Sequence, residues 1–166
     1  MNAFWAYFWP PFGAGLAVGI IAGDFAFRRP ATRYLSLAIG VLATLALVAL
    51  WHGPAGAADR FSAEVERGIH QTIVYWEIPQ VSGHLHHDPL TRRAMLSGPA
   101  DDFQRRELVI VMDQVPGVES ASWSLDGGGT PLIVEGAAVA LLGFLFGLLV
   151  AYLRELRRRY NAEWKW

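Results

Sequence analysis

The chain has 166 residues and a formal net charge of −1, and 53% of its residues are hydrophobic. This composition is too apolar for an ordinary soluble domain, so we expect a membrane protein. Cysteine is absent, which excludes disulfide bonds, thiolate metal sites and a cysteine nucleophile. The charges are segregated along the chain, so their positions are more informative than their sum.

The first apolar segment, residues 3–23, contains no charged residue. From Pro10 to Phe27 a helix would be about 27 Å long, close to the thickness of a hydrocarbon core. Pro10 and Pro11 suit the first turn of this helix, and the aromatic residues before them are typical of a membrane surface. The first basic residue, Arg28, follows the apolar segment, whereas a signal peptide would have a basic residue ahead of it. We therefore predict a retained membrane span.

Two further apolar segments, residues 34–51 and 132–153, are each long enough to cross a membrane. Arginine residues follow the first and third segments, so the positive-inside rule places both of these ends in the cytoplasm. Glu135 falls in the first turn of the third span, where the helix dipole favours an acid without any further role. We predict a bacterial inner-membrane protein with three spans, its N-terminus outside, residues 53–131 in the periplasm and its C-terminus in the cytoplasm.

The predicted periplasmic segment has the pattern of a small α+β domain. Apolar residues at helical spacing predict one helix over residues 59–76 and another over 101–115. Between them, alternating residues predict two short strands joined at "HHDP". Residues 118–125 predict a third strand, and Gly117 before it suits the positive φ of a helix C-terminus. The predicted order is helix, strand, strand, helix, strand.

This pattern resembles the BON domain, a small bacterial envelope module with the same order of elements. The likeness covers roughly residues 62–126 and depends on Leu96-Ser97-Gly98, Gln104-Arg105-Arg106, Pro116-Gly117-Val118 and Leu125. The chain departs from the family at Trp123, near the position where Asn is usual, and the sequence contains neither a secretion signal nor a second copy of the module. The resemblance implies a binding or scaffolding module, because lipid association and docking are known roles of the family and catalysis is not.

The segment "HLHHDP" supplies His84, His86, His87 and Asp88, a ligand set that zinc, copper or nickel would accept. In a strand, His84 and His86 share a face while His87 points away, so at most two histidines and Asp88 converge. A polar turn built on Asp-Pro explains the same residues without a metal. We favour the turn and keep a metal or pH sensor as an alternative hypothesis.

His52 follows Trp51 at the outer end of the second predicted span. A histidine at a membrane boundary is able to ligate haem or a chlorin pigment. The competing interpretation is a helix end at which Trp51 anchors the span and His52 is solvated. We favour the solvated helix end and expect no cofactor.

Small residues repeat at four-residue spacing on two predicted spans, which allows helix backbones to approach closely. They are Gly15, Gly19 and Gly23 on the first span and Gly143, Gly147 and Ala151 on the third. Ser36, Gly40 and Thr44 form a weaker face of this kind on the second span. The partner of each face is either another helix of this chain or a second protein.

Two other segments are candidates for contact with a partner or with lipid. The apolar run "LVIVM" more than fills the core face of a helix, which leaves Val109 and Ile110 for a partner, for lipid or for the sheet. Trp164 and Trp166 follow an arginine-rich tail that suits anionic lipid or a neighbouring subunit. Membrane topology accounts for the arginines, so we do not expect nucleic acid.

The predicted fold class is an α-helical membrane protein with three transmembrane helices plus a small α+β (αββαβ) domain. The sequence has no nucleophile–base pair, phosphate-binding loop or nucleotide motif, so we expect a protein that is not an enzyme. The favoured hypothesis is an accessory, scaffolding or assembly subunit of a larger membrane complex, for example a photosynthetic or respiratory one. Its expected partners are other integral membrane subunits and membrane lipid. The alternatives are a stand-alone envelope protein that binds phospholipid and the histidine-based sensor.

Overall fold

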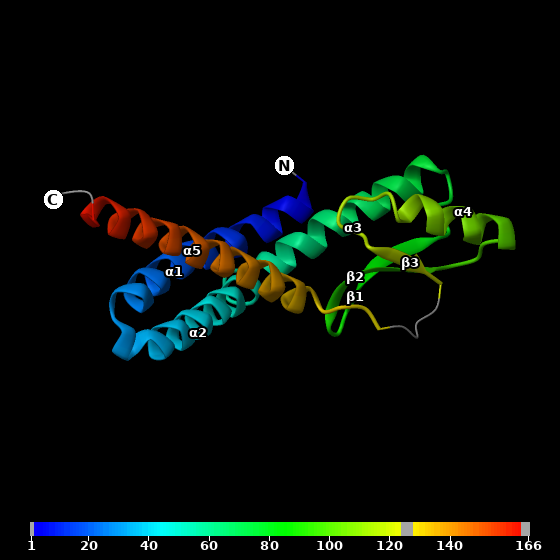
Figure 1. The fold of residues 1–166 in the computed structure, drawn as a ribbon. Helices are drawn as coiled ribbons and strands as arrows, with labels where there is room; N and C mark the ends of the chain where they lie inside the picture. The colour runs from blue at the N-terminus through cyan, green and yellow to red at the C-terminus, as the bar shows by residue number, and fades with distance from the viewer. Residues whose placement is uncertain (1, 124–127, 164–166) are drawn as a thin grey trace. The chain divides into compact units, whose positions relative to one another are not determined.

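A computed structural model of the chain describes residues 2–123 and 128–163. Contacts divide the chain into two compact units (Figure 1). The αβ unit takes in the residues up to 7 and residues 56–135, and the helix bundle takes in residues 8–55 and those from 136 onward. The elements are, in order, α1 (Ala3–Arg28), η1 (Pro30–Thr32), α2 (Arg33–His52), α3 (Ala57–Tyr75), β1 (Ser82–His87), β2 (Leu90–Ser97), α4 (Asp102–Met112), β3 (Ser120–Ser122) and α5 (Leu132–Glu163).

Helices α1, α2 and α5 are long and apolar enough to cross a membrane. Their 26, 20 and 32 residues correspond to about 39, 30 and 48 Å of helix, against a hydrocarbon core of about 30 Å. The three predicted apolar helices are therefore present, and their length and composition suggest a membrane location.

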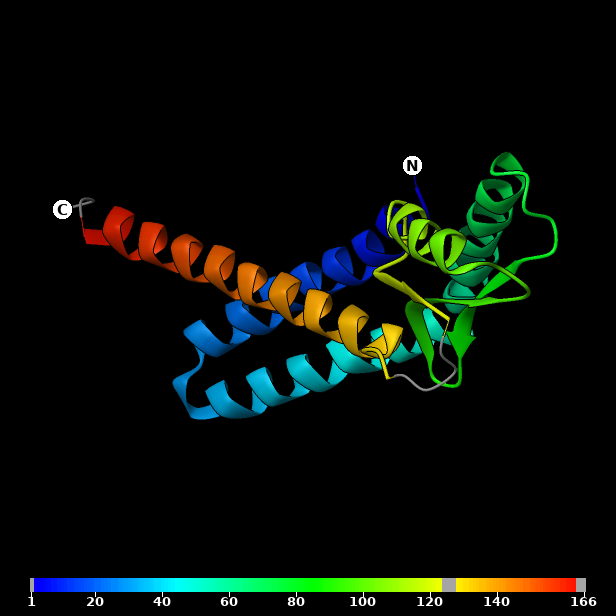
Figure 2. The same cartoon turned by 90° about the vertical axis from the view of Figure 1, so that its right-hand side faces the viewer.

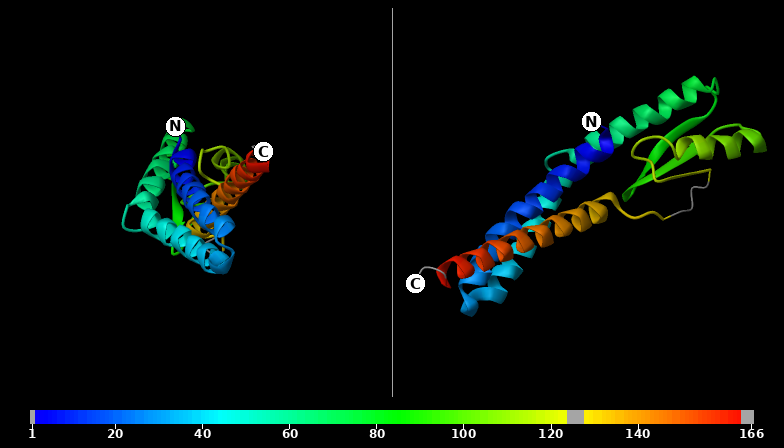
Figure 3. Two further views of the ribbon diagram at one scale, coloured as in Figure 1. Left: turned by 60° about the vertical axis from the view of Figure 1, so that its left-hand side comes forward. Right: turned by 45° about the horizontal axis from the view of Figure 1, so that its top comes forward.

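Within the bundle, the three helices lie side by side (Figures 1 and 2), and the left panel of Figure 3 shows them foreshortened. Small side chains fill its interior, including Ala22, Gly40, Thr44 and Ala140. The Thr44 hydroxyl donates to the Gly40 carbonyl oxygen at 2.9 Å, and the Ser36 hydroxyl of α2 donates to the Ala22 carbonyl oxygen of α1 at 3.1 Å. These bonds satisfy both hydroxyl groups without water.

The start of α1 differs from the prediction. The helix begins at Ala3, so Pro10 and Pro11 lie inside it and not in its first turn. Asn2 supplies the missing start signal, because its side-chain oxygen accepts a hydrogen bond from the Trp5 N–H at 3.2 Å. Prolines inside an apolar helix are tolerated where neighbouring helices compensate for the lost hydrogen bonds.

The end of α5 also lies beyond its predicted position at Leu153. The helix continues through the arginine-rich segment to Glu163. Arginine and leucine are good helix formers, and the Glu155 carboxylate accepts a hydrogen bond from Arg159 one turn later at 3.0 Å. The predicted tail is therefore helical up to Glu163, and Trp164 and Trp166 lie outside the described residues.

The αβ unit has the helix, strand, strand, helix, strand order predicted from the sequence. Its sheet has the order β1-β2-β3, with β1 antiparallel and β3 parallel to β2. Helices α3 and α4 lie over one face of this sheet (Figures 1 and 2). The core between them consists of Phe61, Val65, Ile69 and Ile73 of α3, Leu85 and Ala94 of the sheet, and Leu108 and Met112 of α4.

Helix α4 and the last strand of the unit are shorter than predicted, and α4 ends at Met112 where residue 115 was expected. Gly117 has a φ of 104°, as its predicted place after α4 requires, and Val118 beyond it is buried. Strand β3 then covers only Ser120–Ser122, so Trp123 follows the strand and does not belong to it. Leu125, the predicted end of the strand, lies outside the described residues.

Candidate functional site

Helix α4 is positioned by a cap at its start and by its buried face. The Asp101 carboxylate accepts a hydrogen bond from the Gln104 N–H at 2.7 Å, and the Gln104 side chain accepts one from the Asp101 N–H at 3.1 Å. This reciprocal cap satisfies two of the amides that a helix start leaves free. Leu108 and Met112 then pack into the core, with 1% and 0% of their surface exposed. The helix consequently holds its opposite face toward solvent.

That outer face carries two large apolar side chains. Ile110 is 55% exposed and Phe103 is 71% exposed. They are seven residues apart and therefore share one face of α4. Val109, which we grouped with Ile110 from the sequence, is only half-exposed. The sequence interpretation missed Phe103 because it stands among charged residues, although its spacing to Ile110 was a usable signal.

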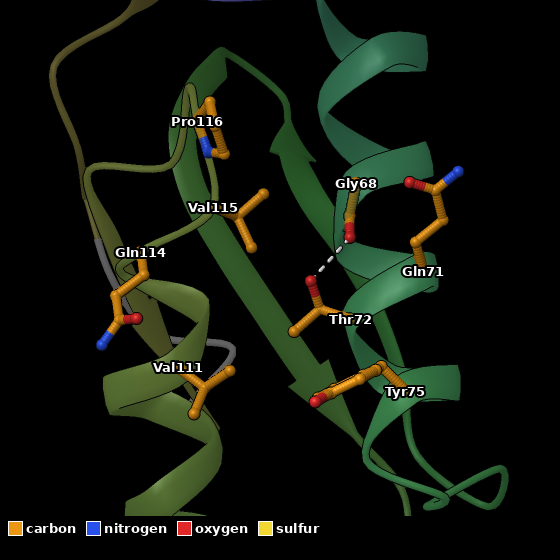
Figure 4. A pocket seen from close by; sticks show the side chains of 8 residues that line it. All are labelled: Gly68, Gln71, Thr72, Tyr75, Val111, Gln114, Val115 and Pro116. Carbon is orange, nitrogen blue, oxygen red and sulfur yellow. Dashed lines mark hydrogen bonds between the residues drawn. The ribbon is translucent and has the colours of Figure 1, made fainter.

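The face leads into a groove of about 390 Å³ between α3 and the end of α4 (Figure 4). Gln114 is four residues beyond Ile110 and lines this groove together with Val111 and Val115. Across it, Gly68 lets the α3 backbone come close to Val115, because a Cβ there would lie 3.1 Å from the valine side chain.

The α3 wall of the groove is polar at its rim. The Thr72 hydroxyl donates to the Gly68 carbonyl oxygen at 2.9 Å, as the dashed line in Figure 4 shows, so its donor is already used. Tyr75 lies at the open end and is 82% exposed. Gln71 and Gln114 also line the groove, and in Figure 4 their amide groups point away from the valine side chains, so these polar groups lie at its outer edges. An apolar centre with a polar rim is the anatomy of a docking surface.

We name the exposed face of α4 (Phe103, Ile110) and the adjoining groove the α3–α4 surface. Comparison with protein-family models, curated proteins and solved structures finds no match for this chain. The possible roles of this surface therefore follow from its own residues.

The histidine side chains of β1 do not converge on one site. His84 is exposed, and the His86 ring donates to the Pro89 carbonyl oxygen at 3.0 Å in the turn. His87 points to the other face, as predicted, and its Nε2 donates to the Glu66 carboxylate of α3 at 2.9 Å. Among the described residues no group of three His, Cys, Asp or Glu side chains is placed to hold a metal ion.

Glu66 has a second contact that explains its place in the structure. The same carboxylate oxygen accepts a hydrogen bond from the Leu85 N–H at 3.0 Å. One side chain of α3 thus binds both the backbone of β1 and the ring of His87. This is a structural linkage between helix and strand, with no ligand needed to account for it.

His52 is the last residue of α2 and is half-buried. The favoured solvated helix end and the alternative haem or pigment contact both stay predictions. Asp88 is exposed in the turn beside Pro89.

The small-residue faces of the bundle pack on each other. A Cβ on Gly15 would overlap the Ala140 carbonyl oxygen, and one on Gly19 would overlap that of Phe144. In the reverse direction, Gly143 lies against the Phe12 carbonyl oxygen and Gly147 against that of Leu16. A Cβ on Gly23 would lie 2.6 Å from that of Ala151. The α1 and α5 faces are therefore used within this chain, which leaves other surfaces for a second protein.

Arg92 of β2 holds a cluster that the sequence interpretation did not identify. Its Nε lies 2.8 Å from the Glu135 carboxylate at the start of α5, and its terminal nitrogen lies 3.5 Å from that of Glu119. Its guanidinium also stands over the Phe4 ring, 5.4 Å from the centroid. The side chains of Arg92 and Glu135 are both 17% exposed. Glu135 therefore has a charged, largely buried partner in addition to the helix dipole.

The first residues of α1 pack against the αβ unit close to Arg92. Tyr7 is 2% exposed, and its ring centroid lies 5.5 Å from that of Phe61 on α3. Phe4 and Tyr7 thus contact side chains of the αβ unit, and the aromatic belt at the membrane surface in which the sequence interpretation placed both stays a prediction.

Proposed function

We propose that this chain is a non-enzymatic accessory or scaffolding subunit of a larger bacterial membrane complex. In this proposal the bundle lies in the inner membrane, and the αβ unit docks onto a partner subunit through the α3–α4 surface. The observation that carries the proposal is the exposure of Phe103 and Ile110 beside a groove lined by both valine and polar side chains.

Exposed apolar side chains gathered on one helix face are a recognised mark of contact surfaces. Burial of the Phe103 and Ile110 side chains against a partner would stabilise the complex by about 25 cal/mol per Å² of apolar area removed from water. The glutamine and tyrosine side chains around the groove suit a polar rim. A protein partner is therefore favoured over a small polar ligand.

Arginine positions support the orientation. Arg28, Arg29 and Arg33 lie between the first two apolar helices, and Arg154 to Arg159 lie in the second half of α5. The positive-inside rule assigns these ends to the cytoplasm. The N-terminus and residues 53–131 are then periplasmic.

The resemblance to the BON domain belongs to this proposal. The αββαβ order and the positive φ of Gly117 in Pro116-Gly117-Val118 support it. If it holds, docking or lipid association is the expected class of role. A fold alone does not define a function, so the experiment addresses the surface directly.

The test compares complexes purified in mild detergent from native membranes. Ile110→Glu places a charge on the α3–α4 surface, and Ala63→Glu places one on an exposed position of α3 that does not line the groove. Exposed substitutions of this kind change stability by only about 0.5 kcal/mol, and circular dichroism verifies the fold. We expect co-migrating subunits with the wild type and with Ala63→Glu, and their loss with Ile110→Glu.

A wild-type chain that migrates alone would contradict the proposal. Retention of the same subunits by Ile110→Glu would contradict the assignment of the surface. If Ile110→Glu instead loses only co-purified phospholipid, the αβ unit is a lipid-binding module and the stand-alone alternative replaces the complex subunit.

A further inference from the structure

Four arginine side chains from two distant parts of the sequence line one pocket at the end of the helix bundle. Arg28 ends α1 and Arg33 begins α2, whereas Arg158 and Arg159 lie near the end of α5. The pocket has a volume of about 610 Å³. The positive-inside rule explains why these arginines share one side of a membrane, but it does not require them to converge on one cavity.

The pocket has an excess of positive charge. Glu155 is its one acidic lining residue among the residues that the structure describes, and it already accepts a hydrogen bond from Arg159 at 3.0 Å and lies 3.5 Å from Arg158. Outside the lining, the Asp24 carboxylate lies 3.9 Å from Arg28, a long contact between an exposed arginine and a half-buried aspartate. Guanidinium groups held near one another repel, and an anion between them would remove that cost.

Arg33 is held in place by an aromatic ring. Its guanidinium stands over Phe27, 5.9 Å from the ring centroid, and Phe27 packs edge-on against Tyr152 of α5 at 5.7 Å. These two rings form the wall of the pocket on the side where α1 and α5 become apolar. A planar guanidinium positioned in this way matches the oxygen geometry of a phosphate.

An apolar track leads away from the pocket along α5. Leu145 and Leu149 precede Tyr152 at i, i+4, i+7 spacing and therefore share its helix face. They are 59% and 49% exposed. A ligand with a phosphate among the arginines and an acyl chain along these leucines would satisfy both parts of the site, whereas free phosphate would use only the first.

We propose that this arginine pocket binds the phosphate headgroup of an anionic phospholipid, with an acyl chain on the Leu145–Leu149 face. The inference rests on the membrane location in the proposed function, and it does not depend on the αβ unit having a partner. Basic pockets between membrane helices are suited to phospholipid headgroups.

The experiment is native mass spectrometry of the full chain in mild detergent, with phosphatidylglycerol, phosphatidylcholine or inorganic phosphate added. We expect the wild type to retain phosphatidylglycerol in preference to phosphatidylcholine. Arg33→Gln/Arg158→Gln should weaken phosphatidylglycerol binding about tenfold or more, because two charge-assisted donors are lost. Arg29→Gln/Arg157→Gln removes the same charge from outside the pocket and should retain wild-type binding.

Equal retention of the two lipids by the wild type would overturn the inference without reference to any variant. Equal weakening by both double variants would also overturn it, since it would indicate general surface charge. Binding of inorganic phosphate with the same dependence on Arg33, and without a lipid preference, would identify an anion site and not a lipid site. If Arg33→Gln/Arg158→Gln does not fold, Arg33→Gln alone is tested. A smaller weakening of phosphatidylglycerol binding is then expected, and unchanged binding would contradict the pocket.

A separate measurement tests the membrane location on which the inference rests. Extraction of the chain from native membranes by alkaline carbonate would contradict the proposed function, whereas a chain that resists extraction and shows no lipid preference contradicts only the pocket.

Discussion

Replacing Gly15 by alanine tests whether α1 and α5 are packed as closely as the structure indicates. A Cβ on Gly15 would overlap the backbone carbonyl oxygen of Ala140, which has no rotamer with which to move away. Gly13 is the matched control, because it lies on the same helix and a Cβ there has nothing within 4 Å. The two substitutions add the same methyl group to the same apolar helix.

The magnitude follows from two opposing effects. Alanine is a better helix former than glycine by about 0.5–1 kcal/mol, and this gain applies at both positions. At Gly15 the helices must also separate or shift, and overpacking of this kind costs about 1–3 kcal/mol. We therefore expect Gly13→Ala to be neutral or slightly stabilising and Gly15→Ala to be less stable than Gly13→Ala by about 1–3 kcal/mol.

The assay is unfolding of the purified full chain in mild detergent by graded addition of sodium dodecyl sulfate, followed by far-ultraviolet circular dichroism. The midpoint for Gly15→Ala should fall below that for Gly13→Ala. Equal midpoints would refute the close packing of α1 on α5. The glycine face of α1 would then be available for contact with another protein.

Three single substitutions and one double variant in the αβ unit are measured by the same unfolding method. Asp101→Ala should cost about 1 kcal/mol, because the Gln104 N–H loses its acceptor; an unchanged midpoint would argue against the cap. Leu85→Ala should cost about 2–5 kcal/mol, because the side chain is fully buried; a loss well below this range would mean that the core is open there. Arg92→Met should cost about 2–3 kcal/mol by leaving the Glu135 carboxylate without its guanidinium, and Glu135→Gln added to it should restore part of the loss. A double variant no more stable than Arg92→Met would contradict the pairing.

Local patterns predicted the elements of the αβ unit well. The buried faces of α3 and α4 were recognisable because each depends on residues within a few turns. The first turn of α1 was placed too late, because the prolines gave a stronger local signal than Asn2. A tertiary contact of Tyr7 with Phe61 supports the longer helix.

The contacts that define the sites were not available from local spacing. Arg92 and Glu135 are 43 positions apart in number, yet their side chains meet at 2.8 Å. The four-residue repeats of glycine predicted close helix packing, but they do not identify which helix is the partner. Phe103 was not recognised in the sequence because its neighbours are charged. Its place on the α3–α4 surface depends on its exposure in the folded chain.

The most direct measurement of the central claim is photocrosslinking in native membranes from position 110. A benzophenone amino acid replaces Ile110 in one chain and Ala63 in the control, and the products are identified by mass spectrometry. A docking role for the α3–α4 surface predicts a discrete protein adduct from position 110 and none from position 63. Adducts only with lipid from position 110, or the same protein adducts from both positions, would contradict it.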